Sequence, residues 1–138
     1  MRRTLAAALM ALCLGAAQPA AGNEDCPAGS GAVMAGAPDA PWTIAIKLDP
    51  KGVPLSAPFQ AEITICPVKS GKPTRVTVDA TMPAHKHGMN YAPTLRHLEE
   101  GRFEVRDLLF HMPGVWRFEV TAYLDGKPYR YVHDLTVQ

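Results

Sequence analysis

Apolar and polar side chains alternate along short runs between residues 42 and 137, and this alternation is the strongest constraint on the fold. Residues 42–48 place Trp, Ile, Ile and Leu at every second position, and residues 59–65 place Phe, Ala, Ile and Ile in the same way. A spacing of two gives a β-strand one apolar face that can be buried. Further runs with this alternation begin at Arg75, Phe103, Trp116 and Tyr129. No run in this region has the longer spacing of an amphipathic helix, so an all-β fold is predicted.

Turn-forming residues separate these runs at short intervals. Residues 49–52 (Asp-Pro-Lys-Gly) close the first run, and Pro67 and Pro83 end the next two, because proline cannot donate a hydrogen bond to a strand ladder. Asp125-Gly126 is typical of a hairpin turn between the last two runs, and the slipped alternation at residues 107–110 indicates a bulge. We therefore predict an immunoglobulin-like antiparallel β-sandwich of about six to seven strands.

The first 41 residues differ in composition from the rest of the chain. Residues 1–22 combine Arg2 and Arg3 with an uncharged stretch rich in Ala and Leu and a small-residue cleavage zone, which is the pattern of a secretory signal peptide. Residues 23–41 are rich in Gly, Ala and Pro and are expected to form a flexible leader. The β-sandwich domain is then expected to cover residues 42–138, in a secreted or periplasmic protein.

Charge and hydropathy argue against two classes of partner. The chain has 14 Lys and Arg against 13 Asp and Glu, so no basic surplus exists to neutralise a phosphate backbone. The only uninterrupted apolar run lies in the predicted signal peptide and is shorter than the roughly 20 residues that span a bilayer. We expect neither a nucleic-acid partner nor a transmembrane segment in the mature protein, and the oligomeric state is open.

Two cysteines, Cys26 and Cys66, remain after removal of the predicted signal peptide. An even number of cysteines in an oxidising compartment favours a disulfide, which would join the leader to a strand and stabilise the fold by ~3 kcal/mol. In this interpretation Cys66 lies on the polar side of its strand. A redox or metal-binding pair is the alternative, although the two residues lie far apart and lack C-x-x-C spacing.

Histidine and methionine gather in two segments, residues 82–89 (Met-Pro-Ala-His-Lys-His-Gly-Met) and residues 111–113 (His-Met-Pro). An extended backbone from His85 to His87 would point both imidazoles to the same side. Imidazole binds several transition metals, whereas thioether sulfur favours soft Cu(I). Because the segments adjoin strand ends, a sandwich can bring them to one rim, and we predict a copper site there. The candidate metal ligands are Met82, His85, His87, Met89, His111 and Met112.

Several of these histidines and methionines also have a purely structural interpretation. Met82 continues the inward-facing row of its strand and can be core filler, and His111 can be a hydrogen-bonded rim residue. His97 lies among charged residues and is interpreted as part of a solvated loop, and His133 as structural.

The sequence lacks the usual signs of an enzyme. It contains neither a G-x-S-x-G elbow nor a phosphate-binding glycine loop, and its H-x-H has no third ligand nearby for hydrolytic zinc. The favoured function is a Cu(I) carrier or chaperone. The alternative is a metal-free interaction or assembly module that contacts a periplasmic or membrane protein.

Three segments resemble the YtkA-like domain family, which is akin to the exported part of FixH-like proteins. These segments are residues 82–88 (Met-Pro-x-His-x-His-Gly), 101–105 (Gly-x-Phe-x-Val) and 110–118 (Phe-x-Met-Pro-Gly-x-Trp-x-Phe). The resemblance covers roughly residues 42–137 and implies a small extracytoplasmic immunoglobulin-like sandwich associated with copper handling. It also implies a copper-receiving protein or a respiratory oxidase assembly factor as partner. The family pattern falls on Met82, His85, His87 and Met112 as site residues, with Gly114 as turn and Trp116 as core anchor.

Overall fold

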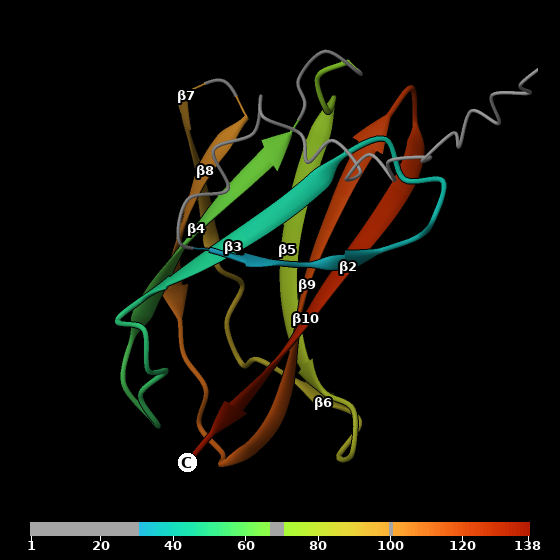
Figure 1. Ribbon diagram of the computed structural model, residues 1–138. Coiled ribbons are helices and arrows are strands. Elements are labelled where there is room, and N and C mark those ends of the chain that lie inside the picture. The colour runs from blue at the N-terminus through green and yellow to red at the C-terminus, as the bar shows by residue number, and fades with distance from the viewer. Residues whose placement is uncertain (1–30, 67–70, 100) are drawn as a thin grey trace, which may run out of the picture.

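The computed structural model describes residues 31–66, 71–99 and 101–138, and these form two antiparallel sheets of five strands each (Figure 1). One sheet has the order β1-β3-β4-β8-β7 and the other the order β2-β10-β9-β5-β6. The strands of the first sheet are β1 (Ala32–Val33), β3 (Thr43–Asp49), β4 (Phe59–Cys66), β8 (Arg102–Leu108) and β7 (Thr94–Glu99). Those of the second sheet are β2 (Ala35–Gly36), β10 (Lys127–Val137), β9 (Gly114–Leu124), β5 (Arg75–Met82) and β6 (His87–Gly88).

The strand order confirms the predicted immunoglobulin-like sandwich. If β3 to β10 are taken in chain order as strands A, B, C, C′, D, E, F and G, one sheet reads A-B-E-D and the other G-F-C-C′. This is the arrangement of immunoglobulin-type sandwiches. The six strands predicted from alternation are β3, β4, β5, β8, β9 and β10, and the structure adds four more, of which three have only two residues.

The predicted hairpin and bulge are both present. Asp125 and Gly126 link β9 to β10 with φ angles of 50° and 82°, as a tight turn with two left-handed residues requires. In the β4–β8 ladder, Phe59 pairs with Leu108 and Ala61 pairs with Val105, so β8 carries one extra residue there.

Strand β7 was not predicted, because its sequence is mostly polar and is interpreted as a solvated loop. It is the edge strand of the first sheet and pairs with β8 from Thr94 onward. Its polar side chains face solvent, and Arg96 forms an ion pair with Glu104 of β8 at 2.8 Å. An edge strand needs little apolar surface, and its charges discourage pairing with other chains.

The predicted boundary between leader and domain at residue 42 differs from the structure. Strands β1 and β2 lie within the expected leader, and each pairs with a different sheet. Met34 between them is 3% exposed, and its N–H donates to the Ile44 carbonyl. This part of the leader is ordered because its two short strands pair with β3 and β10 and Met34 is buried in the core. The signal peptide and Cys26 lie outside the described residues.

Cys66 was predicted on the polar side of its strand, but it is buried at the end of β4 with 4% exposure. Its neighbours on the same strand face, Thr64 and, across the ladder, Ala45, are also buried. The alternation therefore gave the correct face for Cys66, but this outer corner of the first sheet is covered, so the cysteine is buried rather than exposed. The pairing of Cys66 with Cys26 stays a prediction.

The core between the sheets is apolar and closely packed. The largest fully buried side chains are Trp116, Tyr131, Phe59, Phe110, Phe118, Ile44, Ile46, Ile63, Ile65, Met82, Leu108 and Val105.

Within the described residues, no helix is long and apolar enough to cross a membrane.

An exposed cross-strand ion pair gives a first prediction about stability. Arg117 donates two hydrogen bonds to Asp134, at 2.8 and 2.9 Å, and these hold the pKa of the Asp134 carboxyl below its ordinary value of 3.8. A depressed pKa stabilises the folded state above the unfolded-state value, and this contribution is lost as the pH falls through the folded-state pKa. We expect Asp134→Asn to lower the urea midpoint at pH 7 by less than about 1 M, because both side chains are solvated. The difference from the wild type should vanish well below pH 3.8.

Candidate functional site

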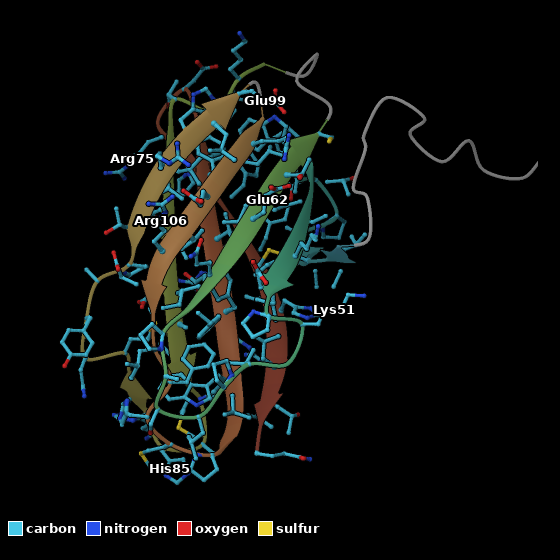
Figure 2. The ribbon with its side chains drawn as sticks, turned by 90° about the vertical axis from the view of Figure 1, so that its left-hand side faces the viewer. Lys51, Glu62, Arg75, His85, Glu99 and Arg106 are labelled. Atoms are coloured by element: carbon cyan, nitrogen blue, oxygen red, sulfur yellow. The ribbon has the colours of Figure 1, made fainter. Side chains whose placement is uncertain are left out.

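The predicted ligands gather at the end of the sandwich where β5 ends and β9 begins. Figure 2 shows His85 at this end and Glu99 at the opposite end. The last residue of β10, Val137, pairs here with Gly114, the first residue of β9. Segments 82–89 and 111–113, which are distant in sequence, therefore meet at one rim, as predicted.

His87 is positioned by a tight reversal of the chain after β5. Residues 83–86 form a turn in which the His85 N–H donates to the Met82 carbonyl at 3.1 Å and Lys86 adopts a φ of 51°. The short strand β6 then returns along β5 and places His87 directly opposite Met82. Cross-strand partners share one face of a sheet. Since Met82 is 1% exposed, His87 lies on the face of the sheet that is turned toward the core.

The backbone from His85 to His87 is not extended, so the condition under which both imidazoles would point to the same side is not met. The left-handed conformation of Lys86 breaks the alternation, so the two imidazoles do not share an environment. His85 is exposed at the tip of the turn, whereas His87 is half-buried. The structure thus separates the two histidines that are closest in sequence.

The partner of His87 is His111, which lies between Phe110 and the start of β9. The two imidazole rings meet edge to face, with their centroids 4.8 Å apart and their planes at 84°. Phe110 is fully buried in the core, so the backbone before His111 is firmly anchored.

The His87–His111 pair has two unsatisfied ring nitrogens. His87 Nε2 and His111 Nδ1 are both buried, and neither has a hydrogen-bond partner within the described part of the chain. Buried polar atoms nearly always have a partner, and an isolated one is destabilising. Two such atoms on touching rings call for a shared partner, and a water molecule or a bound ion can supply it.

Trp116 lies against both imidazoles. Its ring centroid is 5.8 Å from that of His87 and 5.7 Å from that of His111. Its Nε1–H donates to the Met112 carbonyl at 2.9 Å, and this bond holds Met112 beside the pair. The sequence pattern had indicated Trp116 only as a core anchor.

Met82 lies on the core side of this rim. It is buried in the core, as its structural interpretation predicted, and its terminal methyl packs closely against Gly114. A Cβ on Gly114 would lie 2.9 Å from Met82 Cε. Gly114 also has a φ of 129°, which other residues rarely adopt. The glycine thus gives Met82 room under the chain that leads from Met112 to Trp116.

Met112 and Met89 are both half-buried and pack against the core. Met112 follows His111 directly in the chain. The Met89 N–H instead donates to the carbonyl of Ala80, which lies two residues before Met82 in β5. Met89 also lines a different hollow, over the outer face of the second sheet, together with Asp79 and Glu119. The described contacts therefore bring together Met82, His87, His111 and Met112, and leave His85 and Met89 at the margin.

Among the described residues, no group of three or more His, Cys, Asp or Glu could hold a metal ion. A conventional zinc or calcium centre built from those residue types is therefore not present in this part of the chain. The potential metal donors at this rim are the two imidazoles of His87 and His111, together with the side chains of Met82, opposite His87 in the ladder, and Met112, next to His111 in the chain.

A further hollow lies away from this rim. It measures about 680 Å³ and opens between β5 and the β7–β8 edge, over Val76, Leu95 and Phe103. His97 stands at this hollow with its ring 5.0 Å from that of Phe103. None of the six predicted ligands lines it.

Comparison with known proteins supports the fold alone. No known family model and no curated protein matches the chain. A similar solved structure is that of a DUF4785 family protein from Legionella pneumophila subsp. pneumophila str. Philadelphia 1, with a TM-score of 0.52 and 12% sequence identity. The match covers 73% of this chain and 29% of that chain, so this protein corresponds to less than a third of its neighbour.

Proposed function

We propose that this protein is an exported copper-binding protein, a carrier or chaperone that holds Cu(I) between His87 and His111. The observation that carries the proposal is the pair of buried ring nitrogens without hydrogen-bond partners on two touching imidazoles. A neutral imidazole nitrogen without a proton is a metal ligand. A metal ion is a partner that both nitrogens can share.

The neighbouring thioethers favour copper over other metals. Zinc and iron bind imidazole but gain little from thioether sulfur, whereas Cu(I) is soft and accepts both. Met112 is held beside the pair through its carbonyl, and Met82 lies across the ladder from His87. Among the described residues, no Asp, Glu or Cys joins the two histidines in a group that could hold a metal ion, so a soft monovalent ion suits this site better than a harder divalent one.

The location of the pair also suits transfer. His87, in the short strand β6, and His111, between β8 and β9, lie at the end of the sandwich, and His85 is exposed in the turn before β6. An ion held by few ligands can be passed on by ligand exchange at such a rim. The recipient would be another protein with soft ligands. Export rests on the signal-like pattern of residues 1–22.

A competition titration tests the proposal. Metal-free protein is titrated with Cu(I) under reducing conditions against a chromophoric Cu(I) chelator, and the expected result is one tightly bound equivalent. Met112→Leu should weaken binding by about 10-fold because it removes a soft donor while keeping the apolar volume. Met34→Leu is the matched control, because Met34 is buried in the core between β1 and β2, and it should bind like the wild type.

The proposal fails if the folded wild-type protein does not compete with the chelator. A protein that binds no metal but captures a partner through this rim would then be the metal-free interaction module predicted as the alternative. Metal analysis of protein isolated from its own compartment provides an independent check.

A further inference from the structure

Trp116 is held more rigidly than a simple core residue needs to be. It is fully buried, and one face of its indole stacks on Phe110 with a centroid distance of 4.4 Å and an interplanar angle of 5°. Its Nε1–H is already used by the Met112 carbonyl. Both the position and the rotation of the ring are therefore determined.

The indole borders the place where an ion would bind. Both imidazole centroids lie within 6 Å of its own. The two nitrogens without partners are inaccessible to solvent, and the indole lies against both of the rings that carry them. An ion bound to these nitrogens would therefore lie close to the indole.

We propose that Trp116 determines the oxidation state that the site prefers, by favouring Cu(I) over Cu(II). This inference rests on the proposed function. An aromatic ring attracts a nearby cation but supplies no lone pair, and the only polar atom of this ring is a donor that is already bonded. Trp116 would thus occupy space next to the ion without donating a ligand atom to it. Cu(I) accepts few soft ligands, whereas Cu(II) prefers a tetragonal set of N and O donors, which the indole excludes.

Fluorescence tests the contact without perturbing Trp116. The sequence has two tryptophans, and Trp42→Phe leaves Trp116 as the single indole fluorophore. Trp42 lies at the start of β3 beside Tyr131, away from the imidazole pair. In this variant, Ag(I), a soft monovalent ion that does not change oxidation state, should change the emission of Trp116 and saturate at one equivalent. Stoichiometric Ag(I) binding with unchanged emission would overturn the proposal.

A second experiment tests the preference itself. Trp116→Phe should lower the Cu(I) affinity by about 10-fold, because the phenyl ring attracts the cation less than the indole does. The Cu(II) affinity should fall by less than about 3-fold, because the smaller ring leaves space for a water ligand. Phe118→Leu, a change at the next inward position of β9, is the control for general loosening of the core. It should change both affinities by the same small factor.

The outcomes separate this inference from the proposed function. If the wild type binds neither Cu(I) nor Ag(I), both are overturned. If it binds Cu(I) tightly and Trp116→Phe weakens both oxidation states equally, only the role of Trp116 is overturned. Unequal loss in Trp116→Phe, with equal loss in Phe118→Leu, supports it.

Discussion

Replacing His87 and His111 together by alanine is expected to lower the Cu(I) affinity by more than about 100-fold. Changes to residues that only orient a ligand already reduce metal affinity by 10–100-fold, so the loss of both ligands must exceed this. The substitution also removes two buried nitrogens without partners, and this gain offsets part of the ring packing against Trp116 that is lost with the imidazoles. The double variant should therefore stay folded and lose less stability than truncation of a well-satisfied buried side chain would cost. Chelator competition and urea denaturation measure the two effects.

His85→Ala is the matched control for this experiment. His85 has the same side chain and lies only two residues from His87, but it is exposed at the tip of the turn. Its removal should change the affinity by less than about 10-fold, which is below the range for residues that orient a ligand. Equal losses in the His85 variant and the double variant would show that the buried pair is not the site. Such a result would return the site to the H-x-H segment indicated by the sequence.

Gly114→Ala is expected to destabilise the protein by about 2–4 kcal/mol. Two causes add together. A residue with a side chain is strained at a φ of 129°, and the new Cβ would lie 2.9 Å from Met82 Cε, which is confined in the core. Met82 must then shift, and we expect the Cu(I) affinity to fall as well. The free energy of unfolding is measured by urea denaturation of the metal-free protein.

Gly126→Ala separates these two causes. Gly126 also has a positive φ, of 82°, but no atom lies within 4 Å of a Cβ placed there. This control should lose only the conformational part, about 1 kcal/mol. It should bind copper normally, because the β9–β10 turn lies at the other end of the strands. If Gly114→Ala costs no more than Gly126→Ala, the contact with Met82 does not constrain the rim.

The strands of the sandwich core could be predicted because each carries its burial pattern in its own sequence. Strand β5 has the bounds that alternation and Pro83 indicate, and the hairpin at Asp125-Gly126 follows from local turn preference. Strand β7 could not be predicted in this way. It is an edge strand with solvated charges, and only its pairing with β8 makes it a strand.

The candidate site shows the same division. Imidazole and thioether groups at one rim could be expected, since their segments adjoin strand ends. The sequence suggested that His85 would act with His87, because neighbours at i and i+2 share a face of an extended chain. The pairing of β6 with β5 instead turns His87 inward and leaves His85 outside. The sequence did hold a sign that His111 is the partner of His87. Only a short segment joins His111 to Trp116, and alternation places Trp116 in the core.

The sequence by itself determined which side chains face inward along each main strand, since alternation at period two is a local property of the backbone. It also determined that histidine and methionine side chains lie next to strand ends. Only the tertiary structure decided that His87 meets His111, and that Trp116 lies beside both. Those contacts join residues from separate strands, and their burial depends on how the two sheets close over the rim rather than on any one segment.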